Sequence, residues 1–185
     1  MKSGILIFSV WLTWLVFCPM GLAAEKVYHI GPGDVIEISV WKDPELSRNL
    51  IVPPDGIISV PLIGSISVTQ LTVPELRKIV TQKLSEFIPD PTVTAMLIEI
   101  NSLKAYVIGK VNKPGEFPIN LETNVMQILA QAGGLTPFAS GGNIRILRQK
   151  DNQVTNIAFD YGEVEKGKNL EQNIILQPGD VVVVP

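Results

Sequence analysis

Residues 105–148 read AYVIGKVNKPGEFPINLETNVMQILAQAGGLTPFASGGNIRILR, and this stretch decides the fold of the second half of the chain. Its opening run, residues 105–111, is β-branched and aromatic, which is typical of a strand. Pro114 and Gly115 then supply turn chemistry, because proline presets φ and glycine accepts a positive φ. The alternating apolar residues of a returning strand follow at Phe117, Ile119 and Leu121. Together these features predict a β-hairpin.

A helix is predicted after the hairpin. Asn124 can cap it, and Gln127 completes a pair similar to a capping box. Apolar residues at helical spacing follow at Val125, Ile128, Leu129 and Ala132. Gly133 and Gly134 predict where the helix ends. Because Ile144 begins a further strand, the order is hairpin, helix and strand, which is typical of a β-grasp unit.

The same block resembles the SLBB (soluble-ligand-binding β-grasp) domain. The residues that carry the resemblance are Tyr106-Val107-Ile108-Gly109-Lys110-Val111, Lys113-Pro114-Gly115-Glu116-Phe117-Pro118, and the run 128–138 around Ala132-Gly133-Gly134-Leu135. The resemblance implies a β-grasp fold. SLBB domains occur in proteins of quite different function, so this stretch leaves the activity open.

The first half of the chain reads as short strands around one helix. Gly31-Pro32-Gly33-Asp34 is a turn signal, and the strand after it alternates apolar and polar residues as far as Val40. The sequence Pro-Gly-Asp-Val recurs at residues 178–181, before the apolar end of the chain. Pro54-Asp55-Gly56 marks another turn, between two apolar runs. Residues 92–100 predict a further strand.

The predicted helix covers residues 73–87. Thr72 caps it and Glu75 closes a capping box. Its apolar stripe consists of Val73, Leu76, Val80, Leu84 and Phe87. Pro89 and Pro91 are expected to end it. We therefore expect a compact β-rich unit with one covering helix.

Residues 28–100 resemble the polysaccharide export sequence of bacterial polysaccharide biosynthesis/export proteins. The resemblance is carried by Tyr28, Ile30-Gly31-Pro32-Gly33-Asp34-Val35, Val40-Trp41, Val52, Pro54-Asp55-Gly56, Val60-Pro61-Leu62-Ile63-Gly64, Leu71-Thr72 and Asp90-Pro91. In that family an SLBB domain follows directly, as it does here. The resemblance implies a ring-forming periplasmic protein that passes capsular or exopolysaccharide to the cell exterior with an inner-membrane polysaccharide co-polymerase.

The sequence departs from the larger members of that family. They carry further SLBB domains and a carboxy-terminal amphipathic helix that crosses the outer membrane. This sequence has one SLBB unit and ends after the apolar run 181–184, which is expected to close the SLBB sheet. We therefore expect a periplasmic ring that docks beneath a separate outer-membrane channel.

The expected fold class is α+β, with two small domains. Residues 27–100 form the β-rich export domain with its covering helix, and residues 101–185 form the SLBB β-grasp domain. The 185 residues include 18% charged residues and have a formal net charge of -3. This balance predicts no nucleic-acid partner and no acidic membrane surface as a partner.

Residues 1–24 are predicted to be a secretory signal peptide. Lys2 precedes an apolar run, and small residues close it at Ala23 and Ala24, after which cleavage is expected. The alternatives are an uncleaved anchor and lipidation of Cys18, although Phe17 is bulky where a lipidation site needs a small residue. Each alternative places the remainder of the chain outside the cytoplasm, and the family resemblance implies the periplasm, in association with the outer membrane.

The sequence predicts no catalytic, metal or cofactor site. His29 is the single histidine, and it is expected on the surface of a strand. Asp34, Asp55 and Asp180 could be proposed as paired acids for sugar hydrolysis, but each occupies a turn where aspartate bonds its own backbone. No cluster of cysteine and histidine is available for a metal.

Trp41 and Arg145 are the candidate polysaccharide contacts. Trp41 could stack on a sugar ring, although partly buried packing at a strand end is the commoner role of such a residue. Arg145 could touch an acidic polymer, whereas Arg148 is expected to be a solvated charge. The leading hypothesis is a non-enzymatic export component that forms or caps a ring. A monomeric periplasmic carbohydrate-binding module is the main alternative, and a carbohydrate-active enzyme is the third.

Overall fold

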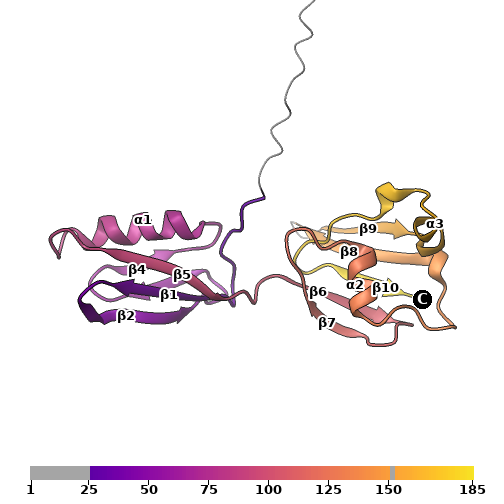
Figure 1. The fold of residues 1–185 in the computed structure, drawn as a ribbon, viewed down its shortest axis with the longest axis horizontal. Coiled ribbons are helices and arrows are strands. Elements are labelled where there is room, and N and C mark those ends of the chain that lie inside the picture. Colours follow the sequence, from indigo (N-terminus) through magenta and orange to yellow (C-terminus); the bar gives the residue numbers. More distant parts are fainter. Residues whose placement is uncertain (1–25, 151–152) are drawn as a thin grey trace, which may run out of the picture.

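The computed structural model describes residues 26–150 and 153–185, and it contains two units with separate hydrophobic cores (Figure 1). The chain passes from the first unit to the second through residues 100–103. Both units combine strands and helices, so the predicted α+β class is confirmed.

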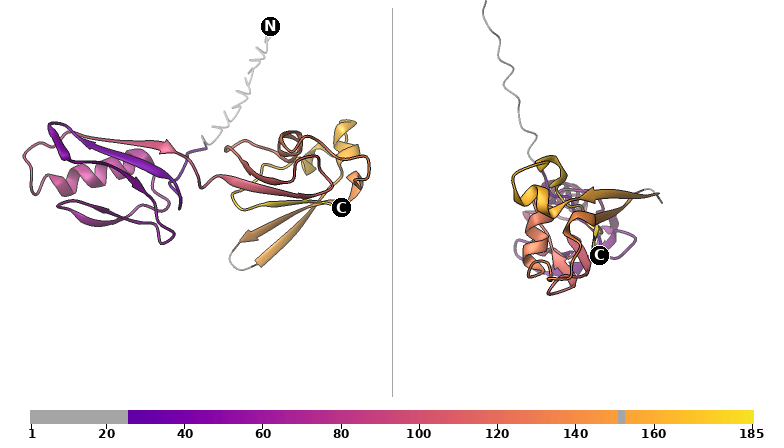
Figure 2. Two further views of the ribbon diagram at one scale, coloured as in Figure 1. Left: turned by 90° about the horizontal axis from the view of Figure 1, so that it is seen from below. Right: turned by 90° about the vertical axis from the view of Figure 1, so that its right-hand side faces the viewer.

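The first unit contains a three-stranded antiparallel sheet in the order β2-β1-β5, with β1 in the centre. A separate hairpin, β3–β4, and one helix, α1, enclose its core against this sheet (Figures 1 and 2). The elements are β1 (Val35–Val40), β2 (Asp43–Ile51), β3 (Ile57–Val60), β4 (Gly64–Ser67), α1 (Val73–Leu84) and β5 (Val93–Glu99).

Alternation in β1 follows the predicted pattern, because Ile36, Ile38 and Val40 are buried while the residues between them are more exposed. The predicted capping box of α1 is also confirmed, with reciprocal bonds between Thr72 and Glu75. Both features depend only on neighbours in the sequence, which is why a local pattern was sufficient to predict them.

The predicted extension of α1 to Phe87 is wrong. The helix ends at Leu84, and the Ser85 hydroxyl donates to the Gln82 carbonyl at its end. Phe87 is 56% exposed, while Ile88 packs against the core in its place. The chain therefore leaves the helix one turn before the predicted end, and the next apolar residue to face the core lies outside the helical stripe.

The second unit contains a five-stranded sheet in the order β7-β6-β10-β8-β9. Its core lies between this sheet and the short helices α2 and α3. The elements are β6 (Lys104–Gly109), β7 (Gly115–Pro118), α2 (Val125–Gln131), η1 (Gly141–Asn143), β8 (Ile144–Lys150), β9 (Gln153–Phe159), α3 (Tyr161–Glu165), η2 (Leu170–Gln172) and β10 (Val181–Val184).

Two predictions for this sheet need correction. Gly115 is the first residue of β7 and pairs with Val107, so the chain reverses before it, and the returning strand ends at Pro118. The last strand, β10, belongs to this sheet, as predicted. It lies in the centre, parallel to β6 and antiparallel to β8, with Val182 and Val184 buried. The final residues of the chain therefore join the two halves of the sheet.

The predicted ends of α2 are confirmed. Asn124 and Gln127 form a capping box, and Gly133 and Gly134 follow the helix with φ values of 78° and 79°. Among the described residues, no helix has both the length and the apolar character needed to span a membrane.

Candidate functional site

The two Pro-Gly-Asp-Val sequences form similar turns in the two units. In the first, the Asp34 carboxylate accepts from the Gly31 N–H at 2.8 Å, and in the second, the Asp180 carboxylate accepts from the Gln177 N–H at 2.8 Å. Both aspartates are almost completely buried. The prediction that these residues bond their own turns is confirmed. Each of them also accepts hydrogen bonds from residues outside its turn.

Asp34 connects its turn to the segment between the two units. Its second carboxylate oxygen accepts from the backbone N–H groups of Asn101 and Ser102, at 3.0 and 2.9 Å. The Tyr28 hydroxyl donates to the first oxygen and also lies 2.9 Å from the Ser102 hydroxyl. Gly31 fits closely here, since a Cβ on it would lie 2.6 Å from the Ser102 Cβ. The connecting segment is therefore held against the first unit by buried polar contacts.

Burial and the hydrogen bond to Asp34 raise the pKa of Tyr28 to about 12. The phenol donates its proton to a carboxylate, and ionisation would place a second negative charge beside the first. Tyr28 is therefore neutral and acts as a hydrogen-bond donor, which suits a structural link better than acid–base chemistry.

Asp180 is paired with Arg148, so the prediction that Arg148 is a solvated charge is wrong. The Arg148 Nε and Nη2 atoms donate to the two carboxylate oxygens at 2.9 and 2.7 Å. The same guanidinium donates to the Ile175 carbonyl at 3.1 Å. Asp180 raises the pKa of Arg148 through this paired hydrogen bond. Arg148 thus ties β8 to the turn before β10 and is not free to bind a ligand.

Trp41 lies at the tip of the first hairpin and is 71% exposed, so the expected partly buried packing is wrong. Val40 pairs with Asp43, which leaves Trp41 and Lys42 as the two-residue turn between β1 and β2. A hollow of about 360 Å³ adjoins the indole, and its other wall is formed by residues 88–92. An exposed indole beside carboxylate groups can stack on the apolar face of a sugar and leave its hydroxyls for hydrogen bonding.

Arg145 is exposed on β8 and borders a hollow of about 270 Å³. The amide side chains of Asn143 and Asn156 lie on the same hollow. Among the described residues, Arg145 forms no ion pair, in contrast to Arg148. The structure does not bring Arg145 and Trp41 into one site, because they border separate hollows on separate units.

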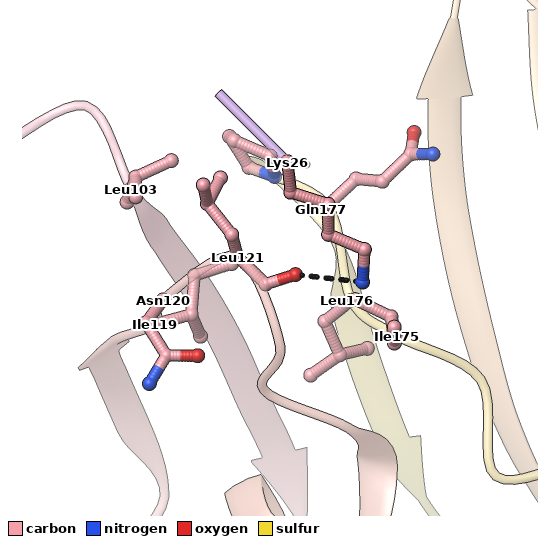
Figure 3. Close-up of a pocket in the computed structure, with 9 residues that line it drawn as sticks. Lys26, Leu103, Ile119, Asn120, Leu121, Ile175, Leu176 and Gln177 are labelled. Carbon is pink, nitrogen blue, oxygen red and sulfur yellow. Dashed lines mark hydrogen bonds between the residues drawn. The ribbon is translucent and has the colours of Figure 1, made fainter. Parts of the chain in front are cut away.

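A third cleft, of about 350 Å³, was not anticipated from the sequence (Figure 3). It is mostly aliphatic, and Lys26 reaches across it to donate to the Leu121 carbonyl at 3.2 Å. Its remaining lining residues are Leu103, Ile119, Asn120, Ile175, Leu176, Gln177 and Pro178. Segments from four parts of the chain form this cleft, so no single stretch of the sequence could have predicted it. The cleft can accept an apolar group but has few polar groups to orient a sugar.

The motif glycines occupy positions where the backbone, and not a side chain, makes the contact. At Gly109, φ is 97° and a Cβ would lie 2.0 Å from the Val184 carbonyl oxygen, so β6 and the end of β10 approach closely because this residue is glycine. At Gly56, φ is 70° and a Cβ would meet the Thr69 hydroxyl. Gly33, Gly133 and Gly134 also have positive φ.

The remaining predicted positions form no catalytic group in the described part of the chain. His29 is exposed and precedes β1, outside any strand. Asp55 accepts from the Ile57 N–H within its own turn at 3.1 Å, and Pro54 is in the same turn. Across residues 26–150 and 153–185, no group of histidine, cysteine and acidic side chains is placed to hold a metal. The predicted cleavage after Ala24 and the alternative at Cys18 lie outside the described residues.

Comparison with known proteins gave two matches in order along the chain. A sequence model of the family described as polysaccharide biosynthesis/export protein matches residues 22–97. A model of the SLBB domain matches residues 103–184. Residues 98–102 lie between the two matches, and they include Asn101 and Ser102, whose backbone N–H groups donate to Asp34.

Several curated proteins are similar over most of the chain. The EPS I polysaccharide export outer membrane protein EpsA of Ralstonia nicotianae is 27% identical over 88% of this chain and 48% of its own length. The polysialic acid transport protein KpsD of Escherichia coli is 29% identical over 85% of this chain and 28% of its own. The capsule polysaccharide export outer membrane protein CtrA of Neisseria meningitidis is 27% identical over 89% of this chain and 45% of its own length. The chain thus spans about half or less of the length of these relatives.

Proposed function

The chain belongs to the polysaccharide biosynthesis/export family, with an SLBB domain after the export domain, and we propose that it is a component of an envelope machine that exports capsular polysaccharide or exopolysaccharide. The observation that carries the proposal is the order of the two domains. The export-family model matches residues 22–97, and the SLBB model follows it at residues 103–184. Relatives that are named for polysaccharide export or transport align with most of this chain, across both domains.

We propose that the protein acts by assembly and contact, without catalysis. Polymer would meet weak, repeated contacts, among them Trp41 and Arg145, so that it can move on. Two observations support this. The three turn aspartates are engaged by backbone N–H groups, and the phenol of Tyr28 is held neutral by its raised pKa. Incubating the purified protein with the host polysaccharide and measuring chain length tests the proposal, and shortening of the polymer would contradict it.

The proposed partners are further copies of this chain in a ring, an inner-membrane polysaccharide co-polymerase and a separate outer-membrane channel. The proposed location is the periplasm, beside the outer membrane that the names of two relatives mention. The proposed processing is cleavage after Ala24. Mass spectrometry of the protein from its host membranes measures the amino terminus, and an acylated Cys18 would contradict cleavage at Ala24.

Deletion of the gene tests the export function directly. Export should stop while polymer still forms inside the cell, and the complete gene should restore export. Normal export in the deletion strain would contradict the proposal. The separate channel is tested by adding the purified protein to lipid vesicles, where pores formed by this protein alone would be the contrary result.

The alternative is a monomeric periplasmic carbohydrate-binding module. The aliphatic cleft and the two hollows are observations that such a module could use. Sedimentation of the protein as its host processes it distinguishes the two. A ring component should sediment as a discrete oligomer, whereas a binding module should sediment as one chain at every concentration.

A further inference from the structure

The five-stranded sheet has one face that α2 and α3 do not cover. Along β6, β8 and β10, every second residue points into the core and is at most 1% exposed, namely Ala105, Val107, Ile144, Ile146, Val182 and Val184. The residues between them face the other side, where Tyr106 is 39% exposed and Ile108 is 47% exposed. We call this surface the open face and define it as Tyr106, Ile108, Val181, Val183, Arg145, Leu147, Asn156 and Ala158.

The strand register arranges the open face in two rows. One row crosses four strands in the order Tyr106, Val181, Leu147 and Asn156, and Glu116 of β7 borders it at the edge beside Tyr106. The next row crosses four strands in the order Ile108, Val183, Arg145 and Ala158. Tyr106 therefore lies two strands and one row from Arg145, or about 12 Å at the usual strand spacing and rise per residue. The surface between them is aliphatic, so it is a flat platform with an aromatic ring near one end and a cation near the other.

Charge on the open face is concentrated at Arg145. At the opposite edge, Lys104 and Glu116 form an ion pair at 2.7 Å and compensate each other. Arg148, on the same strand, is occupied by Asp180. Arg145 has no ion-pair partner among the described residues, and the amide of Asn156 borders its hollow. A guanidinium among apolar groups is a strong receptor for carboxylate, because its planar fork gives two parallel hydrogen bonds.

We propose that the open face binds the polymer itself and selects an acidic polysaccharide, with Arg145 receiving a sugar carboxylate and Tyr106 stacking on a sugar ring. This inference rests on the proposed export function and names its substrate class. Asn156 supplies hydrogen bonds to neighbouring hydroxyls. An acidic polymer is preferred to a second copy of the chain as the occupant, because its negative charge is opposite to that of Arg145. A second copy of the chain seated on this face would bury Arg145, and it would have to bring a carboxylate to that cation or leave it unpaired.

The test uses the protein purified as its host processes it and two probe polymers of the same linkage. One is polygalacturonate, and the other is polygalacturonate whose carboxyl groups have been reduced to alcohols. Affinity electrophoresis should show tighter binding to the acidic probe. Arg145→Gln should weaken that binding roughly tenfold, because one charge-assisted contact is lost. Arg145→Lys should recover only part of it, because an ammonium lacks the fork.

Lys150→Gln is the matched control, since it removes an exposed cation from the same strand on the opposite side of the pleat. It should bind polygalacturonate as the unchanged protein does. Tyr106→Ala should weaken binding to both polymers by a similar factor, roughly threefold, because stacking does not depend on the carboxylate. Equal binding of the two probes by the unchanged protein, or an Arg145→Gln protein that binds normally, would overturn the proposal.

Sedimentation of the same variants gives the remaining outcome. If Arg145→Gln alters the oligomer and leaves polygalacturonate binding intact, the open face is a contact between copies and the proposal fails. The export function is judged separately, by the gene deletion. A deletion that blocks export combined with a protein indifferent to the carboxylate would reject the acidic substrate and leave the export function standing.

Discussion

Tyr28 is the residue through which high pH should act on the first unit. Its pKa is raised to about 12 in the folded protein, from an ordinary value of 10.0, by burial and by the hydrogen bond to Asp34. A raised folded pKa contributes stability that is complete below the unfolded pKa and is lost as pH rises through the folded one. The free energy of unfolding should therefore fall between about pH 10 and about pH 12.

Urea titrations of the unchanged protein and Tyr28→Phe across that range measure this effect. The variant should show a shallower decline. Lys104, whose pKa the Glu116 hydrogen bond raises, is present in both proteins, so the difference between the two curves isolates Tyr28. Parallel curves would mean that the phenol is not linked to folding.

Arg148, inside β8, should matter to stability far more than a solvated charge on a strand would. Its side chain is 18% exposed, and that of Asp180 is 1% exposed. Arg148→Met would leave a buried carboxylate without its partner, at a cost of about 3 kcal/mol or more in the free energy of unfolding. Chemical denaturation monitors the loss. Lys150→Gln, on the same strand, should change stability by less than about 0.5 kcal/mol. Equal effects in the two variants would show that the pair does not stabilise the fold.

At the scale of elements, α1 stabilises the first unit through one stripe of buried side chains. Leu76, Val80 and Leu84 are fully buried, whereas Phe87 lies beyond the helix in solvent. Leu84→Ala, and equally Leu76→Ala, should cost roughly 2 to 5 kcal/mol, because each leaves a cavity that the surrounding core fills only in part.

Phe87→Ala is the comparison for α1, since it removes a larger apolar side chain from a position one turn away. Its cost should stay below about 1 kcal/mol. Thermal or urea unfolding followed by circular dichroism reports both variants. A small loss in Leu84→Ala would contradict the packing described here, and a large loss in Phe87→Ala would indicate a partner surface over that end of the helix.

For the whole molecule, we expect the arrangement of the two units to depend on the hydrogen bonds that Asp34 accepts from Asn101 and Ser102. Asp34→Asn replaces one acceptor oxygen by an N–H₂ group that faces backbone donors, so the connecting segment should be released. Small-angle X-ray scattering should then show a larger maximum dimension while circular dichroism is unchanged. Asp55→Asn, in an exposed turn, serves as the control. Identical scattering for both variants and the unchanged protein would show that Asp34 does not hold the units.

The local features of this protein could be read from its sequence because they depend on residues a few positions apart. The capping boxes at Thr72 and Asn124, the alternation of β1 and the glycines after α2 all have this origin. The resemblance of each half to its family has the same basis, since turn residues recur in a fixed order. These features are sufficient to indicate the α+β class and the family.

The tertiary structure decided the features that depend on residues far apart in the chain. Arg148 meets Asp180 across 32 positions, and Asp34 reaches Ser102 across 68. A charge or a turn aspartate looks the same in the sequence whether it faces water or a buried partner. The central place of β10 and the exposure of Trp41 at a hairpin tip were likewise hidden. Sequence patterns report spacing along one chain, whereas burial and pairing depend on which segments the fold brings together.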